Sequence, residues 1–425
     1  MLFTIKRWLF NNETINQTIA KNTFWLFFGQ MASRLLRAAV VIYAARALGA
    51  ASWGAFSYAL GISAFLTIFS DIGINALLTK EGSRNPEIRN QYLATAFFIK
   101  LAMLGFLTIL VITAFPALTK IEEAAKIMPI LIFVFIFDTL RDLGSAASRA
   151  MEKMEIEAGM QIFANLIIVV LGFVFLSLNR SSMSLAFAYA IGSGIGLVAI
   201  LYTLRDHFRN LFSNFRKGLI KSILVTAWPF GLMGIMGAMM LNSDIIMLGW
   251  LRTAEEVGYY SAAQKPIQLL YIIPTLLAVS TFPIIARLVK SDPGGAKRIL
   301  ERYVRLAMLL SIPVAIIGFI FAKTIIITLF GPEYAAGILT FRILMLTIPI
   351  VYPSTIIGNA IFAYDQQKFL AVFAAAAIFT NIFFNALLIP VWGIEGAAIG
   401  TIATQLFTNF LIWRRIKSIN GLTIL

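Results

Sequence analysis

The chain of 425 residues is 60% hydrophobic and 13% charged, with a mean hydropathy of +0.86, whereas a soluble domain carries about 25% charged residues. This composition excludes a water-soluble protein and predicts an all-α integral membrane protein. The absence of cysteine and the presence of one histidine, His207, exclude disulfides, a thiol nucleophile and cysteine-ligated metal centres. We therefore expect no metal site and no resident cofactor.

Twelve mostly apolar segments follow one another along the chain, each long enough to cross a bilayer core of about 30 Å. In chain order the predicted membrane-spanning helices are Thr23–Leu48, Trp53–Leu78, Tyr92–Phe115, Ile127–Ser148, Ala158–Leu178, Met183–Leu204, Ile223–Trp250, Val257–Ala286, Val304–Phe330, Ile338–Phe362, Phe369–Pro390 and Ile394–Trp413.

The formal charge of +15 is distributed unevenly over the loops between these segments. With the N-terminus placed inside, 23 of the 35 lysines and arginines lie on the inner side, 5 lie on the outer side and 7 lie within spans. Because lysine and arginine concentrate in cytoplasmic loops, this alternation predicts that both termini are cytoplasmic. It also explains the basic charge without a nucleic-acid partner, and the inner loops are expected to meet anionic membrane lipids.

A long basic loop divides the spans into two sets of six. We expect an N-terminal six-helix bundle over residues 1–204, a basic cytoplasmic linker over residues 205–222 and a C-terminal six-helix bundle over residues 223–425. A short internal repeat is consistent with two related halves, because Trp53–Ala59 and Val257–Ala263 share Gly, aromatic, Ser and Ala residues in step. Repeats of the same orientation are typical of transporters with a substrate site between the halves.

Two arginines in the first span indicate a functional region. Gln30, Arg34 and Arg37 lie at i, i+4 and i+7, so they share one helical face. A charged side chain at the bilayer centre costs about 2.5 to 3.5 kcal/mol even on the scale derived from membrane insertion, which gives the lowest values. Each of the two arginines therefore needs an acidic partner or a water-filled cavity. Either acidic groups on other helices, with Asp71 as the nearest candidate, neutralise them, or they line a cationic cavity for an anionic ligand.

Further charges lie in other spans. Asp138, Arg141 and Asp142 are spaced so that Arg141 can pair with Asp138 within its own helix. Lys100 is close enough to the inner surface for its flexible stem to carry the amine there. The remaining candidates, Asp244 and Lys265, lie towards the outer side.

Cations outnumber carboxylates among these residues, which predicts a net positive cavity. The cations within spans are Arg34, Arg37, Arg46, Lys100, Arg141, Lys265 and Arg342, and the carboxylates are Asp71, Asp138, Asp142 and Asp244. Because arginine binds phosphate bidentately, a lipid-borne diphosphate suits such a cavity.

Several short motifs resemble the polysaccharide transporter (Wzx-like oligosaccharide flippase) family of the MOP exporter superfamily, in an order that extends over nearly the whole chain. They are Asn22–Leu26, Ala45–Gly49, Phe69–Ile74, Arg149–Met154, Trp228–Gly231, Asp244–Leu248, Val257–Ala263, Phe330–Tyr334 and Gly393–Ala398.

This resemblance implies a MATE-like fold of two six-helix bundles. It also implies that the protein carries an undecaprenyl-diphosphate-linked oligosaccharide from the inner to the outer leaflet of the cytoplasmic membrane. Ser33 and Arg34, followed by Ala45, Arg46 and Gly49, look like the first helix of lipid II flippases, in which the matching arginine contacts the substrate diphosphate. The resemblance carries this role to Arg34 and, by extension, to Arg37. The two additional C-terminal helices of lipid II flippases are lacking here, which argues against lipid II as the substrate.

These considerations lead to a flippase that works by alternating access and is not an enzyme. Arg34 and Arg37 hold the diphosphate, Arg141 and Lys265 extend the positive wall, and Asp71 or Asp244 resets it. Asp138 and Asp142 are assigned as counter-charges. The superfamily suggests coupling to H+ or Na+, and a polysaccharide polymerase and chain-length machinery are expected partners. The alternatives are a multidrug or cation antiporter of the same fold, which should carry excess carboxylates, and a membrane-embedded glycan polymerase, which should have a large outer loop.

Overall fold

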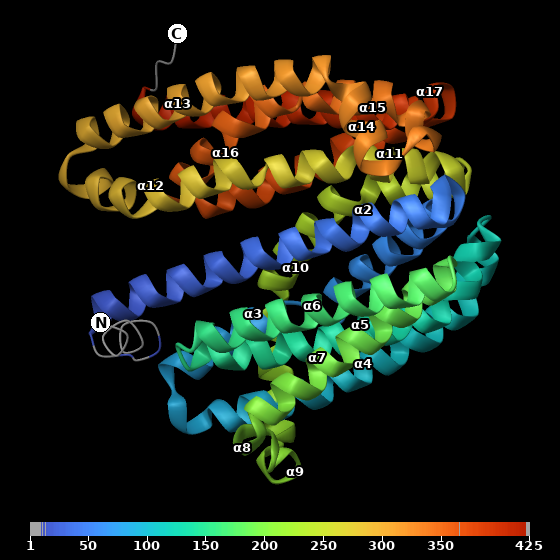
Figure 1. The fold of residues 1–425 in the computed structure, drawn as a ribbon. Helices are drawn as coiled ribbons and strands as arrows, with labels where there is room; N and C mark the ends of the chain where they lie inside the picture. Colours follow the sequence, from blue (N-terminus) through green and yellow to red (C-terminus); the bar gives the residue numbers. More distant parts are fainter. Residues whose placement is uncertain (1–9, 11, 13, 365, 422–425) are drawn as a thin grey trace, which may run out of the picture. The chain divides into compact units, whose positions relative to one another are not determined.

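The computed structural model describes residues 10, 12, 14–364 and 366–421, and all regular elements within them are helices (Figure 1). The α-helices are α2 (Ile15–Phe69), α3 (Ile74–Arg84), α4 (Arg89–Leu118), α5 (Glu122–Ala150), α6 (Met154–Leu178), α7 (Ser182–Thr203), α8 (Arg205–Phe208), α9 (Leu211–Asn214), α10 (Lys217–Leu251), α11 (Ala254–Leu270), α12 (Ile272–Ser291), α13 (Pro293–Ile320), α14 (Ala322–Phe330), α15 (Gly337–Met345), α16 (Ile348–Ala363) and α17 (Gln367–Asn420). Two short 3-10 helices, η1 (Pro86–Ile88) and η2 (Pro332–Ala336), complete the set of described elements.

The described helices have the length and composition of membrane spans. Seven of them are long and apolar enough to cross a bilayer, or eight if the bent pair Pro332–Met345 and Ile348–Ala363 is one span. Two of the seven, α2 and α17, are 55 and 54 residues long, which is about 80 Å at 1.5 Å per residue. Each is two helices joined at a glycine with a positive φ, Gly49 (74°) or Gly393 (55°). The all-α membrane architecture is therefore confirmed, and the number of twelve crossings stays a prediction.

The contacts divide the chain into two compact units, of which unit 1 comprises residues 1–48 and 59–238 and unit 2 comprises residues 49–58 and 239–425. In unit 1, α7 packs against both α5 and α6, and α3 packs against α5. Their shared core is apolar and includes the buried Leu77, Phe135, Leu143 and Ile200. In unit 2, α16 packs against α12, α13 and α17.

The predicted span Trp53–Leu78 is not one continuous helix. α2 ends at Phe69 and α3 starts at Ile74, and the intervening turn contains Ile72 at φ 37° and Gly73 at φ 82°. A non-glycine residue at positive φ is strained, while glycine adopts this conformation freely. The turn lies close to α10, because a Cβ added to Gly73 would lie 2.3 Å from the Ala227 carbonyl oxygen.

The predicted span Val257–Ala286 is also broken, between α11 and α12. Pro274 has no N–H to donate to the carbonyl of Leu270, four residues earlier. The hydroxyl of Tyr352 on α16 donates to that carbonyl instead, at 2.9 Å. A side chain of a neighbouring helix thus satisfies the backbone acceptor that the proline leaves without a helical partner, as a helix in a membrane requires.

The two copies of the internal repeat pack against each other within unit 2. A Cβ added to Gly54 would lie 1.7 Å from the Ala254 carbonyl oxygen, and one added to Gly258 would lie 2.0 Å from the Ala50 carbonyl oxygen. The Ser261 hydroxyl donates to the Ser57 hydroxyl at 3.1 Å. Equivalent positions of the repeat therefore meet, and the glycines are needed because the backbones approach too closely for any side chain.

The basic segment at residues 205–222 lies against α4 through its short helices. Phe98 on α4 contacts the rings of Phe212 and Phe215, and the Thr95 hydroxyl accepts a hydrogen bond from the Arg216 amide at 3.2 Å. Nδ1 of His207 lies 2.9 Å from Oδ1 of Asn90. Burial, with Arg89 and Lys153 nearby, lowers the pKa of His207 below its usual value, so this side chain is neutral at pH 7.

The contact between the repeats leads to a stability prediction. Gly54→Ala forces the backbones of α2 and α11 apart and should lower the free energy of unfolding by about 1 to 3 kcal/mol, the usual cost of overpacking. Gly105→Ala on α4 is the matched control, because an added Cβ there meets nothing within 4 Å. Thermal unfolding of the two detergent-solubilised variants measures the difference, and equal midpoints would contradict the close packing.

Candidate functional site

Arg34 and Arg37 lie on α2, midway between its start and the break at Gly49, and both side chains are exposed. Nε of Arg37 donates to Oδ1 of Asn165 on α6 at 2.9 Å. Within the described part of the chain, Arg34 makes no hydrogen bond or ion pair, and Arg37 has no acidic partner. The two charges that the sequence singled out are therefore not neutralised by neighbouring carboxylates of unit 1.

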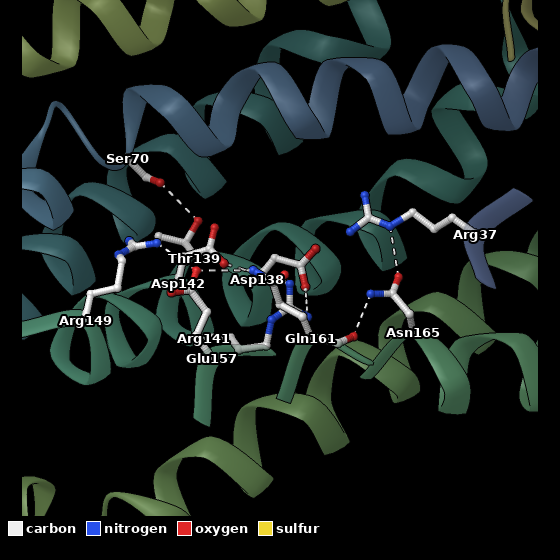
Figure 2. Close-up of polar contacts among 10 residues, drawn as sticks. All are labelled: Arg37, Ser70, Asp138, Thr139, Arg141, Asp142, Arg149, Glu157, Gln161 and Asn165. Atoms are coloured by element: carbon white, nitrogen blue, oxygen red, sulfur yellow. Dashed lines mark hydrogen bonds and ion pairs between the residues drawn. The ribbon is translucent and has the colours of Figure 1, made fainter. Parts of the chain in front are cut away.

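Asn165 belongs to a polar ladder on α6 that the sequence analysis missed (Figure 2). Glu157, Gln161 and Asn165 follow at four-residue steps, with hydrogen bonds of 3.4 Å from Gln161 to the Glu157 carboxylate and 2.7 Å from Asn165 to the Gln161 carbonyl. Glu157 is 4% exposed and pairs with Arg149 at 2.7 Å. The spacing of one polar residue per turn was the available signal, because these three residues share one face of an otherwise apolar helix.

The charges on α5 neutralise one another (Figure 2). Nη1 of Arg141 lies 2.8 Å from the Asp138 carboxylate, and Nη2 lies 3.9 Å from that of Asp142. Arg141 is only 7% exposed, so its charge is held inside unit 1 by two acidic neighbours.

The expected pairing of Asp71 with the arginines of the first span is wrong. Oδ1 of Asp71 lies 2.7 Å from Nζ of Lys100 on α4. The expectation that Lys100 extends to the membrane surface is also wrong, because its side chain is 0% exposed. A fully buried ammonium needs a counter-charge, and the turn between α2 and α3 brings Asp71 to it.

A small polar cavity surrounds this ion pair in unit 1. Its volume is about 150 Å³, which is enough for several water molecules, and it is lined by Thr67, Asp71, Gly73, Asn75, Lys100, Thr139, Asp142, Phe230 and Gly231. The hydroxyls of Ser70 and Thr139 bond at 3.0 Å beside it (Figure 2). Thr67, Asp71 and Asn75, which follow at four-residue steps, thus line a polar cavity beside the broken helix.

Asp244 is the centre of a second polar network, in unit 2. Its carboxylate is 4% exposed and accepts four hydrogen bonds, from Asn381 (3.1 Å), Asn385 (2.7 Å), Tyr260 (2.6 Å) and Thr401 (3.0 Å). No lysine or arginine forms an ion pair with Asp244 among the described residues. Neutral groups supply all four of these hydrogen bonds. The asparagines on α17 were another set that the sequence analysis missed, although they are four residues apart.

Lys265, the remaining candidate, lies on α11 immediately before Pro266 and is half-buried. The structure places it in unit 2, whereas Arg34, Arg37 and Arg141 lie in unit 1. The described residues contain no group of three or more His, Asp or Glu side chains that could hold a metal ion. Several of the candidate residues that the structure describes thus take part in ion pairs, such as Lys100 with Asp71, and in hydrogen-bond networks with asparagine side chains, such as that of Asp244.

Apolar spans that bury ion pairs define a multi-pass membrane protein, and comparison with known proteins gives its family. Residues 19–289 match the family described as polysaccharide biosynthesis protein, and the chain belongs to this family. Residues 229–387 also match the MatE family.

Two of the similar proteins are named for a transport function. The chain is 23% identical over 399 residues to the putative O-antigen transporter of Shigella flexneri, a match that covers 90% of this chain and 94% of that protein. It is 30% identical over 175 residues to the probable flippase AglR of Haloferax volcanii, a match that covers 40% of this chain and 37% of AglR.

Two solved structures establish the fold. The inward-closed lipid II flippase MurJ superposes with a TM-score of 0.77 at 16% identity, covering 93% of this chain and 87% of MurJ. An inward-facing multidrug resistance MATE transporter superposes with a TM-score of 0.75 at 15% identity, covering 92% of this chain and 98% of that protein. The chain therefore has the fold of the MOP superfamily.

The buried pair in unit 1 leads to a double-variant prediction. Lys100→Met leaves the Asp71 carboxylate without its counter-charge and should destabilise the protein by about 3 to 5 kcal/mol. Adding Asp71→Asn removes the uncompensated charge and should restore most of that loss. Thermal unfolding of the two single variants and the double variant in detergent tests this, and an additive loss in the double variant would show that the pair does not act as a unit.

Proposed function

We propose that this protein is a flippase that carries an undecaprenyl-diphosphate-linked oligosaccharide from the inner to the outer leaflet of the cytoplasmic membrane by alternating access. The family, the fold and the transport functions for which the relatives are named support the transport of a lipid-linked glycan. In this proposal both termini are cytoplasmic, and the two faces of the membrane protein open in turn.

The observation that carries the proposal is the unpaired Arg34. Lys21, Lys100, Arg141 and Arg149 each lie within 3.0 Å of a carboxylate in unit 1, but Arg34 has no such partner among the described residues. An arginine in the middle of a span does not face hydrocarbon without a substantial cost. We infer that Arg34 faces an aqueous path, where its guanidinium is available to an anion.

A diphosphate is the anion that best fits this arrangement. Arg34 and Arg37 are three residues apart on one helical face, so two guanidiniums can bind two adjacent phosphate groups bidentately. Nε of Arg37 is already occupied by Asn165, which fixes the orientation of that guanidinium while Nη1 and Nη2 remain available for the ligand. Asp138 and Asp142 are the counter-charges of Arg141 in this proposal. A role of Arg141 and Lys265 in substrate binding stays a prediction.

We further propose that Asp244 binds the coupling cation, either H+ or Na+. The carboxylate and the Thr401 hydroxyl supply oxygen atoms for a small hard cation, and rotation of the Asn381 and Asn385 amides, whose nitrogens donate to the carboxylate here, would add their oxygens. Oδ1 of Asn385 is buried and accepts no hydrogen bond within the described residues, so it is free to act as a ligand. Asp71, which is held by Lys100, is the less suitable coupling residue.

A multidrug or cation antiporter is the alternative suggested by the MatE match. A pocket for organic cations needs exposed carboxylates, whereas the exposed and unpaired charges on α2 are arginines. The charge of this helix therefore favours an anionic substrate.

The role of Arg34 can be measured in proteoliposomes that contain a fluorescent lipid-linked oligosaccharide. Arg34→Gln should lower transport by about 10- to 100-fold, because a lost hydrogen bond to a charged group is worth about 1.5 to 3 kcal/mol. Arg34→Lys keeps the charge without the bidentate geometry, so its transport rate should lie between those of the wild type and Arg34→Gln. Arg180→Gln, an exposed arginine between α6 and α7, is the control and should match wild type; full transport by Arg34→Gln would refute the site.

Coupling through Asp244 leads to a separate prediction. A coupling cation that carries one elementary charge through a membrane potential of 100 mV supplies about 2.3 kcal/mol. This free energy is enough to accumulate the substrate up to about fiftyfold on one side of the membrane. Asp244→Asn should remove the response of transport to imposed H+ and Na+ gradients while leaving exchange down the substrate gradient. Asp206→Asn on α8, an exposed carboxylate, should retain the wild-type response, and a gradient response in Asp244→Asn would assign coupling elsewhere.

A further inference from the structure

A groove on α13 of unit 2 combines arginines with apolar side chains. Its volume is about 560 Å³, and it is lined by Arg298, Glu301, Arg302, Tyr303, Arg305, Leu306 and Leu309. The charge distribution along the sequence places the lysines and arginines from Arg287 to Arg305, which include those at the start of this helix, on the predicted inner side with the termini. All of these residues belong to unit 2, whereas Arg34 and Arg37 belong to unit 1.

The exposed face of α13 changes from basic to apolar along its length. Arg298, Arg302 and Arg305 are exposed at its start, at the i, i+4 and i+7 spacing of one face. The same face continues with exposed apolar residues, Leu309 (68%), Ile312 (48%), Ile316 (52%) and Ile320 (62%). The opposite face, with Leu300, Val304 and Ala307 among its members, is buried against the rest of unit 2.

Two of the three arginines are available for a ligand. Arg298 lies 3.5 Å from Asp292, the residue that caps the helix. Within the described residues, Arg302 and Arg305 form no ion pair and no side-chain hydrogen bond, although Glu301 immediately precedes Arg302. Glu301 itself is 3.8 Å from Lys297. The groove is therefore cationic at one end and apolar at the other.

We infer that this groove is a docking site for the diphosphate head and the first isoprenoid units of the carrier lipid, separate from the arginines of α2. Arg302 and Arg305 would each bind one phosphate of the diphosphate bidentately, and the chain would follow Leu306 and Leu309 onto the apolar stripe. Two adjacent unpaired guanidiniums match a diphosphate better than the single phosphate of a bulk phospholipid. The inference rests on the proposed function, because it takes the carrier lipid as the substrate, and it adds a loading position on the predicted inner side.

Photolabelling can test the docking site with the full-length protein in phosphatidylcholine vesicles. The probe is geranylgeranyl diphosphate with a diazirine on its chain, and adducts are located by mass spectrometry of peptides. We expect adducts on α13 between residues 302 and 312, and we expect Arg302→Gln/Arg305→Gln to reduce their yield about tenfold. Arg302→Lys/Arg305→Lys, which keeps both charges, should retain part of the yield and guards against a loss caused by misfolding.

The matched control removes two exposed arginines outside the groove, Arg209 and Arg287. Arg209→Gln/Arg287→Gln should label α13 as wild type does. An unchanged yield in Arg302→Gln/Arg305→Gln would overturn the docking site. Equal labelling by geranylgeranyl monophosphate, or full competition by a tenfold excess of phosphatidylglycerol, would also overturn it, because the groove would then bind anionic lipids in general.

The same preparation separates this inference from the proposed function. Labelling of α13 that depends on Arg302 and Arg305, in a protein that moves no lipid-linked glycan, would support the docking site and contradict the flippase. Normal glycan transport, together with a labelling yield that does not change when both arginines are replaced, would support the flippase and contradict the docking site.

Discussion

The cost of placing a charge in a membrane-spanning helix is the constraint on which the rest of the structure depends. Unit 1 meets this cost by pairing, as Lys100 does with Asp71 and Arg141 with Asp138. Unit 2 meets it for Asp244 with four neutral donors. Against this background, the exposed Arg34 on α2, which has no ion-pair partner among the described residues, is an exception, and the proposed function rests on it.

The breaks in the helices follow from the same constraint. Hydrocarbon offers no partner for a free carbonyl or amide, so a helix can break inside a membrane only where protein satisfies the freed groups. Tyr352 does this for Leu270 in the break between α11 and α12. The turn between α2 and α3 packs against α10 through Gly73 and Gly231, and it also brings Asp71 to Lys100. At the turn between α2 and α3, a backbone break and a buried ion pair thus occur together.

Composition and the spacing of charges predicted the class of the protein, because both depend on local sequence. The apolar segments coincide with helices, and the i, i+3 spacing on α5 anticipated the pair between Arg141 and Asp138. Contacts between distant helices were not predictable in this way. The partner of Asp71 was misassigned because the choice between Arg34 and Lys100 depends on how α2, α3 and α4 pack, for which the sequence carries no spacing rule.

Polar residues without charge were the other limit of the sequence analysis. Gln161 and Asn165 on α6 are four residues apart, as are Asn381 and Asn385 on α17. Amide side chains occur often in helices, so this spacing alone did not indicate a site. Their role became visible only from the contacts of Asn165 with Arg37 and of the two α17 asparagines with Asp244. The internal repeat shows the opposite case. Its glycines and serines were visible as a weak pattern, and their contacts within unit 2 explain why the pattern exists.

The central claim is that this protein moves a lipid-linked glycan across the membrane, and the sidedness of that glycan in the host tests it most directly. Membrane vesicles of known orientation from cells with the gene deleted would be probed with a lectin or a glycosidase, before and after the wild-type gene is restored. The account predicts that the glycan accumulates on the inner leaflet in the deletion strain and returns to the outer leaflet on restoration. Glycan that reaches the outer leaflet normally in the deletion strain but stays unpolymerised would contradict the account and indicate an enzyme of the same pathway.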